Sequence, residues 1–408
     1  NYDEISSKNN ILRSFSNGLI DKKLISLLKK SEKNDKFIFT NSFQKISESD
    51  VVVVSVNFDF QTKSVKRSFF QLKKLFKKIA ENVSKDTLIM LETTVPPGTS
   101  EKIIYPLITR ILKKRRVNPN KVYFSYSYER VMPGNYYYNS IVNINRCYSG
   151  INEKSFKRCE KFLKLFINYK KYPLHKLDNI RACESSKILE NTYRAVNIAF
   201  IDEWTSFANK IGVNLNKVID GIKLRSTHNN IMRPGLGVGG YCLTKDPEFV
   251  KISSKYIFKT GLNFPITSRS LKINKNMTQN SLKFLKKYFF KKSLKILILG
   301  ASYREDVGDT RFSSSIELFK KLKKKGHNVM IHDPVVLNKL GNNFLKKIPN
   351  LKYFDMVLFC VAHKQYKKIN FSKLSKKPMY FDLNLVLNDK NKNILKKNKY
   401  KLKVLGDD

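Results

Sequence analysis

The chain of 408 residues carries a formal net charge of +46, and 41% of its residues are hydrophobic. Such a length allows two or three domains with real cores, and the hydrophobic content excludes a disordered polypeptide. The five cysteines form no CxxC pair and the five histidines form no metal-ligand pattern, which argues against a zinc site and against a disulfide framework.

The positive charge has more than one interpretation. A nucleic-acid-binding protein would concentrate basic residues in a footprint, but these lysines are spread along the chain, without an RRM, KH, helix-turn-helix or zinc-finger signature. A compositional drift toward Lys and Asn would leave solvated basic faces, and an anionic substrate would benefit from the field. We therefore expect no specific nucleic-acid partner, while a basic nucleic-acid-associated protein stays an alternative.

The chain shows no sign of a membrane segment. No apolar run approaches the ~20 residues of a membrane span, and the polar residues 1–10 do not form a signal peptide. The scattered cysteines fit a reducing compartment. We expect a cytoplasmic protein without a membrane partner.

The N-terminal part of the chain alternates between strand and helix patterns. Residues 1–16 are typical of a strand end followed by a helix, and another helix is expected over 21–30. The apolar, β-branched run 51–56 predicts a strand buried on both faces of a parallel sheet. An amphipathic helix is expected over 65–82, and a second buried strand over 87–92.

The same alternation continues to residue 126. Thr99 or Ser100 is expected to cap the next helix, which runs to about Lys114, and a further strand covers 122–126. This order predicts a doubly wound α/β domain. Ligands in such sheets bind beyond the carboxyl ends of the strands, so the segments that follow these strands are candidate binding loops.

A long helix is predicted over 180–211. Lys187 and Asn191 are four residues apart and therefore share one face of it. A solvated helix surface explains the same spacing, so the spacing alone gives neither residue a function. Shorter helices are expected over 215–224 and 266–287.

Between those shorter helices, the segment 234–246 reads PGLGVGGYCLTKD. Its glycines exclude a regular helix and suit a tight loop with close backbone approach or positive φ. Cys242, Lys245 and Asp246 follow, and a cation together with backbone N–H groups favours the nucleophilic thiolate. The alternative is a glycine turn with a buried cysteine.

A second, smaller α/β lobe begins near residue 290. Its first strand, 295–300, is closely followed by only one glycine, so the lobe lacks a full GxGxxG cradle, although a nucleotide could bind at its strand ends. The other elements predicted here are a helix over 314–325 and strands over 328–331, 356–360 and 379–382.

Five segments, taken together and in this order, resemble the UDP-glucose/GDP-mannose dehydrogenase family of nucleotide-sugar 6-dehydrogenases. The resemblance covers nearly the whole chain. The segments are ETTVPPGTSEKI (92–103), YERVMPGN (128–135), KILENTYRAVNIAFIDE (187–203), PGLGVGGYCLTKDP (234–247) and LGASYREDVGDTRFSSS (299–315).

The resemblance implies an α/β fold with two doubly wound, Rossmann-like lobes joined by a long central helix. It implies an NAD-binding domain over 1–175, a central helical and dimerisation domain with the cysteine loop over 176–288, and a UDP-sugar-binding domain over 289–408. NAD as cofactor, a UDP-sugar as substrate, no metal and a homodimer follow from it. The family's first strand and GxGxxG turn should precede Asn1, so we expect an N-terminally incomplete first lobe.

Members of this family oxidise the C6 alcohol of the sugar through a cysteine-bound thiohemiacetal and thioester, with NAD accepting a hydride twice. Cys242 matches the nucleophile of the family. Lys187 matches the cation that stabilises the oxyanion at C6, and Asn191 matches an asparagine that assists it.

Further roles follow from the same resemblance. Asp246 and Thr94 match groups that position or activate water and the alcohol proton, and Glu129 matches a glutamate that assists hydrolysis. The implied cofactor-binding residues are Asp3 and Lys8, which would hold the adenosine ribose, with Thr94, Lys245 and Arg311. The implied substrate-binding residues are Glu129, Arg130, Lys187, Asn191, Ile231, Met232, Arg233, Pro234, Gly235, Gly239 and Arg304.

The leading hypothesis is an NAD-dependent dehydrogenase that converts UDP-glucose or a UDP-N-acetylhexosamine to its uronic acid for polysaccharide biosynthesis. Two features depart from the family or divide its members. Residues 57–60 read NFDF where the family has a Pro-Thr-Pro-like turn, and Tyr241 and 133–134 point to different sugars. A degenerate, non-catalytic copy of the fold is the alternative that the absent first turn suggests.

Overall fold

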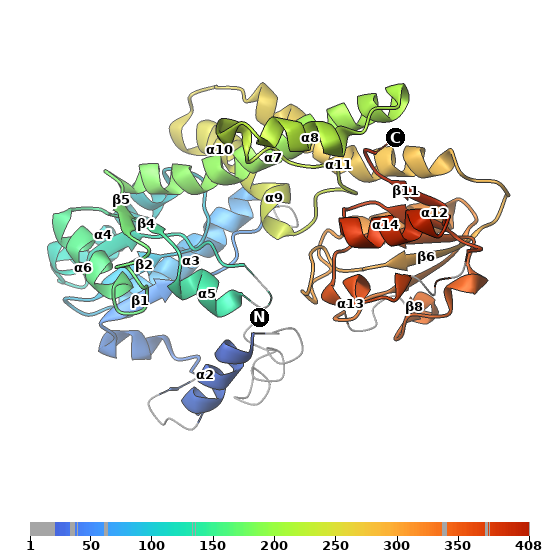
Figure 1. Ribbon diagram of the computed structural model, residues 1–408. Helices are drawn as coiled ribbons and strands as arrows, with labels where there is room; N and C mark the ends of the chain where they lie inside the picture. The colour runs from blue at the N-terminus through green and yellow to red at the C-terminus, as the bar shows by residue number, and fades with distance from the viewer. Residues whose placement is uncertain are drawn as a thin grey trace. The chain divides into compact units, whose positions relative to one another are not determined.

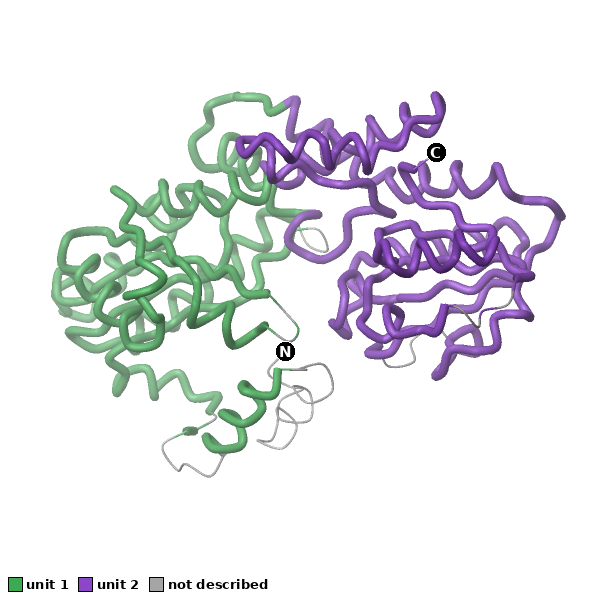
Figure 2. Tube along the Cα trace, viewed as in Figure 1, with its two compact units in different colours: residues 1–16, 21–192, 245–264 green, residues 17–20, 193–244, 265–408 purple. Residues whose placement is uncertain are grey.

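The computed structural model describes residues 21–32, 37–38, 40–60, 64–132, 134, 136–336, 341–371, 374 and 376–407. The chain divides into two compact units (Figures 1 and 2). Unit 1 contains Asp21–Thr192 and Lys245–Phe264, and unit 2 contains Tyr193–Thr244 and Pro265–Asp408. The elements predicted over 1–16 lie outside the described residues, and so do Asp3 and Lys8.

The sheet of unit 1 consists of β1 (Val51–Val54), β2 (Leu88–Leu91), β3 (Tyr123–Tyr126), β4 (Arg146–Gly150) and β5 (Leu174–Lys176), in that order. The first three strands are parallel, which confirms the three predicted strands in slightly shorter form. β2 and β3 are buried throughout, as their apolar sequences require. β4 runs antiparallel to β3, and its sequence RCYSG carries no strand pattern that could have predicted it.

The α-helices that lie wholly within the described part of unit 1 are α2 (Lys22–Glu32), α3 (Val65–Asn82), α4 (Tyr105–Lys114), α5 (Tyr137–Val142), α6 (Glu153–Leu163) and α10 (Phe249–Ile252). α3 confirms the helix predicted over 65–82. Ser64 caps it by accepting a hydrogen bond from the Arg67 amide, and the helix buries Phe69, Leu72 and Phe76 in the core.

The cap predicted for the next helix is wrong. Thr99 already has helical dihedrals (φ −58°, ψ −48°), because a π-helical turn over Ser100–Ile104 precedes α4. The amides of Gly98 and Ser100 instead donate to the carboxylate of Glu184, at 2.6 and 3.0 Å. A buried side chain from a distant helix therefore satisfies the N–H groups that a local Ser or Thr was expected to satisfy.

The long helix predicted over 180–211 is confirmed as α7 (Ile180–Ile211). Its residues up to Thr192 belong to unit 1 and the others to unit 2. In unit 1, Ile180, Cys183 and Ile188 lie in the same hydrophobic core as β2 and β3. The strand-end loops of the sheet thus have a rigid helix packed against them.

Unit 2 begins with helices and ends with a complete α/β lobe. The predicted shorter helices are confirmed as α8 (Leu215–Lys223) and α11 (Pro265–Lys286), and a short helix, α9 (Tyr241–Lys245), follows the non-helical glycine segment. The helices of the α/β lobe are α12 (Ser314–Lys324), α13 (Lys364–Lys367) and α14 (Asp389–Lys397).

The strands of that lobe are β6 (Lys295–Leu299), β7 (Asn328–His332), β8 (Phe344–Leu345), β9 (Met356–Phe359), β10 (Met379–Asp382) and β11 (Leu402–Val404). They form one parallel sheet in the order β11-β10-β9-β6-β7-β8. This is the Rossmann order, whose first and fourth strands, here β6 and β9, are neighbours at the topological switch point. The predicted α/β fold class is therefore confirmed. Among the described residues, none of the helices combines the length and apolar composition needed to cross a bilayer.

Replacing Glu184 with Ala should lower the unfolding free energy by about 2–4 kcal/mol, because two buried amides lose their acceptor. Burial raises the pKa of Glu184 to about 8, and the two amide hydrogen bonds oppose that rise. Urea unfolding measures the change. The control is Glu81→Ala, which removes an exposed helix-surface ion pair with Lys77 and should cost less than about 0.5 kcal/mol. Equal effects in the two variants would contradict the capping role.

Candidate active site

One face of α7 meets the strand-end loops of unit 1. Glu184, Lys187 and Asn191 follow one another at spacings of three and four residues, which places them on the same side of the helix. Lys187 is buried, and its Nζ donates to the backbone carbonyl of Glu129 at 2.9 Å and lies 5.4 Å from the centre of the Tyr128 ring. The ammonium is thus fixed beside the loop that follows β3.

A buried carboxylate, that of Asp246, contacts α7 at Asn191, one helical turn beyond Lys187. The Asp246 side chain is fully buried, and its two oxygens accept hydrogen bonds from Asn191 Nδ2 at 2.7 Å and Lys245 Nζ at 2.6 Å. The Lys245 ammonium also lies 4.5 Å from the centre of the Phe249 ring. The sequence-predicted residues Asn191, Lys245 and Asp246 are therefore brought together, in a cluster that supplies one negative and one positive charge.

The loop after β3 is tied to α7 by Arg130. Its guanidinium pairs with Glu190 at 3.0 Å and donates to the Asn145 carbonyl at 2.7 Å and to the Tyr128 hydroxyl at 3.0 Å. The Glu129 carboxylate accepts a hydrogen bond from the Val131 amide. Arg130 therefore has a positioning role in unit 1, and its contact with a substrate stays a prediction.

Two threonines follow β2, and they are placed differently. Thr93 joins the segments that follow β1 and β2. Its Oγ1 accepts a hydrogen bond from the Val56 amide at 2.9 Å and donates one to the Val56 carbonyl at 2.8 Å. Thr94, the predicted site residue, is half-buried at the same edge. Phe58, in the turn that departs from the family pattern, packs edge-on against Phe249 at 5.6 Å.

A buried ion pair at this edge escaped the sequence analysis. Arg146, at the start of β4, pairs with Glu92 and donates from Nε to Ser127 Oγ at 3.0 Å. Burial lowers the pKa of Arg146 to about 10. Glu92 and Ser127 directly follow β2 and β3, so this pair braces the two loops where a ligand of a parallel sheet binds. No local pattern around Arg146 could have indicated it.

Cys242 lies in unit 2, on the first turn of α9, and its side chain is exposed, whereas the four other cysteines are buried. The alternative of a buried cysteine in a glycine turn is therefore wrong for the chain as described. Gly239 and Gly240 precede it, and a Cβ on either would lie 2.8 Å from atoms of Tyr303. Gly240 also has φ +84°, so both positions require glycine.

The surroundings of Cys242 include a cation. The Gly240 amide donates to the carbonyl of Arg311 at 3.2 Å, and the Arg311 guanidinium lies 5.6 Å from the centre of the Tyr241 ring and pairs with Asp309 at 2.6 Å. That hydrogen bond to Asp309 is the main cause that raises the pKa of Arg311, and the neighbouring Cys242 thiol raises it further. Arg311 is thus close enough to Cys242 for their charges to interact.

The predicted substrate segment 231–235 faces the protein with its side chains. Ile231 and Met232 pack against the cluster formed by Ile201, Ala208, Leu215 and Ile219, and Arg233 pairs with Asp220. A Cβ on Gly235 would lie 2.8 Å from Asn384 Oδ1. Arg304 lies in the loop after β6, and its Nε is 3.5 Å from Oε1 of the Glu305 carboxylate.

The residues assigned to the dinucleotide cofactor lie in several separate segments of the chain. Thr94 and the loops after β1 and β2 lie beyond the carboxyl ends of parallel strands, the edge at which such sheets bind ligands. Asp3 and Lys8, predicted for the adenosine half, are outside the described residues. Lys245 is only 3% exposed and paired with Asp246, so a direct contact of its ammonium with a cofactor stays a prediction.

The comparisons with known proteins agree with this architecture. Residues 3–168, 181–276 and 297–389 match the NAD binding, central and UDP binding domains of the UDP-glucose/GDP-mannose dehydrogenase family. The chain is 30% identical over 405 residues to the UDP-N-acetyl-D-mannosamine dehydrogenase of Methanococcus vannielii, covering 96% of this chain and 84% of that protein. It is 26% identical to the UDP-N-acetyl-D-glucosamine 6-dehydrogenase of Salmonella typhi, covering 86% and 82%.

Solved structures share the fold. UDP-D-ManNAc dehydrogenase from Pyrococcus horikoshii superposes with a TM-score of 0.75 at 23% identity, covering 95% of this chain and 88% of that one. Rossmann-like lobes with NAD and UDP binding domains define a dehydrogenase of nucleotide sugars. The chain belongs to the UDP-glucose/GDP-mannose dehydrogenase family, and it is an NAD-dependent UDP-sugar 6-dehydrogenase.

Replacing Asp246 with Asn should lower the unfolding free energy by about 3 kcal/mol, because it removes one charge of a buried ion pair. The matched control is Asp202→Asn, since Asp202 is also buried and also accepts from an asparagine amide, that of Asn280, at 2.8 Å. Burial raises the pKa of Asp202, so the neutral amide should cost less than about 1 kcal/mol there. A loss in urea unfolding that is no larger for Asp246→Asn would contradict the ion-pair account.

Proposed function

We propose that this enzyme oxidises the C6 alcohol of a UDP-N-acetylhexosamine to the uronic acid, with Cys242 as the nucleophile and UDP-glucose as the alternative substrate. The observation that carries the proposal is the exposure of Cys242, which follows Gly239, Gly240 and Tyr241 in a segment where Tyr303 leaves no room for a Cβ on either glycine. The Arg311 guanidinium places a positive charge close enough to interact with this cysteine. The substrates named for the relatives above support an N-acetylhexosamine.

The residues on α7 stabilise charge at the reacting carbon. The Lys187 ammonium, already held in place by the Glu129 carbonyl, stabilises the negative oxygen that develops on C6. The Asn191 amide assists as a second donor. NAD, when bound, supplies the hydride acceptor for each of the two oxidations.

Cys242 retains the intermediate between these oxidations. Its sulfur adds to the aldehyde carbon as the thiol proton leaves, and the carbon–sulfur bond persists in the thioester after the second oxidation. Water then breaks that bond, which releases the carboxylate and restores the thiolate. Asp246 and Thr94 position the C6 hydroxyl and the water, the Asp246 carboxylate accepts the alcohol proton, and Glu129 assists the hydrolysis.

The ligands are assigned to the residues that the family resemblance implies. The backbone of 231–235, Gly239 and Arg304 hold the UDP-sugar, and the inward-facing side chains of 231–235 support a backbone role. Glu129 and Arg130 are also assigned to the sugar. The residues assigned to NAD are Asp3, Lys8, Thr94, Lys245 and Arg311.

We also propose the domain division into 1–175, 176–288 and 289–408, and a cytoplasmic enzyme whose acidic product serves polysaccharide biosynthesis. The three family-model matches, over 3–168, 181–276 and 297–389, each fall within one of these ranges and so support the division.

A homodimer is supported by exposed apolar residues on α7. They recur at helical spacing from the middle of the helix to its C-terminal end, and Trp204 contacts Phe200 and Phe207 edge-on, with ring centres 6.3 and 5.9 Å away. Exposed apolar stripes of this kind mark protein interfaces. The residues of this apolar stripe and their exposed fractions are Tyr193 50%, Phe200 48%, Trp204 48%, Phe207 52% and Ile211 54%.

The substrate panel tests the chemistry. UDP-N-acetylmannosamine, UDP-N-acetylglucosamine and UDP-glucose are supplied separately to the full-length enzyme with NAD, and NADH absorbance and released acid are recorded. We expect two NADH for each molecule of acid with at least one sugar, and a loss of acid release of more than about a thousandfold in Cys242→Ser, since serine is a far weaker nucleophile.

Cys360→Ala is the matched control, because Cys360 is buried in the second lobe and burial raises the pKa of its thiol. The Cys360→Ala variant should produce NADH and release the acid as the wild type does. Undiminished acid release by Cys242→Ser would contradict the proposed nucleophile.

The dimer is tested by placing a charge in the apolar stripe. Phe207→Glu should shift the protein from dimer to monomer at micromolar concentration in analytical ultracentrifugation, because burying a carboxylate in an apolar interface is costly. Phe70→Glu introduces the same change at an exposed position of α3 and should leave the dimer intact. Two variants with the same sedimentation coefficient would overturn the assignment of the interface.

A further inference from the structure

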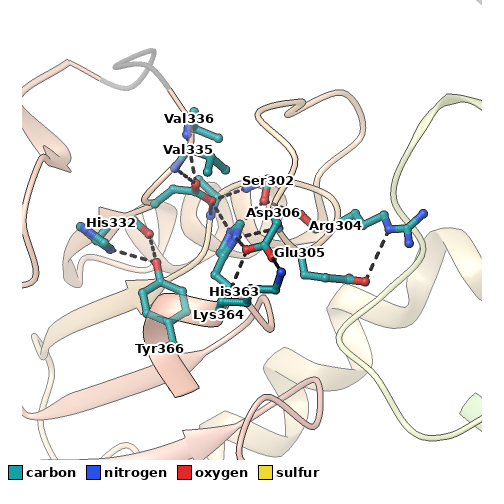
Figure 3. Close-up of polar contacts among 12 residues, drawn as sticks. Ser302, Arg304, Glu305, Asp306, His332, Val335, Val336, His363, Lys364 and Tyr366 are labelled. Carbon is teal, nitrogen blue, oxygen red and sulfur yellow. Dashed lines mark hydrogen bonds and ion pairs between the residues drawn. The ribbon is translucent and has the colours of Figure 1, made fainter. Parts of the chain in front are cut away.

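A buried histidine lies at the topological switch point of the second lobe. His363 follows β9, is 0% exposed, and contacts the loop that leaves β6, the segment 301–311 (Figure 3). His363 has no role in the proposed mechanism. Ligands of a Rossmann sheet bind at this point, so a buried polar side chain here has a bearing on ligand binding.

The hydrogen bonds define the tautomer of His363. Its Nδ1 accepts from the Asp306 amide at 2.9 Å, so Nδ1 carries a lone pair and Nε2 carries the proton. Nε2 lies 3.0 Å from Asp333 Oδ2 and 3.1 Å from Ser302 Oγ. Ser302 Oγ donates to the Arg304 carbonyl at 2.8 Å, and it therefore accepts from the histidine.

Asp333, which follows β7, completes this cluster. Its Oδ2 also accepts from the amides of Ala301 and Ser302, at 2.7 and 2.9 Å. Despite burial, the hydrogen bond from His363 is the main cause that lowers the pKa of Asp333, to about 2, so the group is a carboxylate. His363 and Asp333 together hold the loop at its start and at its middle.

The middle of the loop has a strained backbone that these contacts stabilise. Asp306 adopts a left-handed backbone conformation with φ +54°, which is unfavourable for a residue with a Cβ. Its amide is bound by His363, and its carboxylate accepts from the Lys364 amide at 3.3 Å and lies 3.7 Å from Lys364 Nζ. The turn therefore depends on contacts with the residues that follow β9.

This loop carries two residues that concern the proposed ligands. Arg304 stands between the anchored Ser302 and the anchored Asp306. Tyr303 lies against Gly239 and Gly240, which stand three and two residues before Cys242. Any release of the loop would displace a UDP-binding cation and the support of the cysteine segment together.

We propose that His363, as the neutral Nε2–H tautomer, is a positioning residue that fixes the UDP-binding loop and so preorganises Arg304. The proposal rests on the proposed function, because it takes the loop to bind the UDP group. His363 does not touch the ligand; it acts through Ser302, Asp306 and Asp333.

The test is calorimetric titration of the full-length protein with UDP, which needs neither NAD nor turnover. His363→Ala should weaken UDP binding roughly tenfold or more, the equivalent of losing the ordered loop. His363→Gln should stay within about threefold of the wild type, since its amide can donate to Asp333 and accept from Asp306. The control is His327→Ala, because His327 is a buried histidine of the same lobe before β7, and it should bind UDP normally.

A double-mutant cycle separates positioning from general destabilisation. Arg304→Ala should weaken UDP binding, and adding His363→Ala should weaken it much less than the product of the single effects. If His363→Ala does not fold, Ser302→Ala removes the hydroxyl that links His363 to the Arg304 carbonyl and should weaken binding about threefold.

Unchanged UDP affinity in His363→Ala or Ser302→Ala, or an equal loss in His327→Ala, would overturn the inference. Wild-type protein that binds neither UDP nor a UDP-sugar would overturn the proposed function itself, and the inference with it.

Discussion

The buried face of α7 is the constraint on which the first unit depends. Glu184 satisfies the amides after β2, Lys187 meets the loop after β3, and Asn191 meets Asp246 in the returning segment. Three loops that are far apart in sequence thereby contact successive turns of a single helix, which fixes their positions relative to one another. Rotation or translation of that helix would shift a cap, a cation and an amide together, so the spacing of these residues is fixed by the loops they contact.

Local patterns were enough to predict most elements, because buried parallel strands and amphipathic helices have their own periodicity. The strand over 51–56 and the helix over 65–82 illustrate this. The contacts that hold the loops could not be predicted this way. The pair of Arg146 with Glu92 and the cap of Glu184 on Gly98 join residues more than fifty positions apart, and nothing in either neighbourhood indicates its partner.

The sequence indicated several residues of the candidate site but not the contacts that they make. Resemblance named Lys187, Asn191 and Asp246, and the structure brings them into one region of unit 1. Composition gave no reason for Asp246 to be buried with Lys245, which follows from the fold of the returning segment. In unit 2, the glycines before Cys242 acquire a physical reason only when Tyr303 is seen against them.

In the proposed mechanism the Cys242 sulfur forms a covalent bond with the oxidised sugar carbon. Mass spectrometry of the acid-quenched enzyme tests this bond most directly. The full-length enzyme is mixed with NAD and its best UDP-sugar, stopped during turnover and digested. The peptide that contains Cys242 should gain the mass of the UDP-sugar less four hydrogens, because a thioester forms after two oxidations with loss of the thiol proton. Steady production of two NADH and acid with that peptide unmodified, or with the adduct on another residue, would contradict the account.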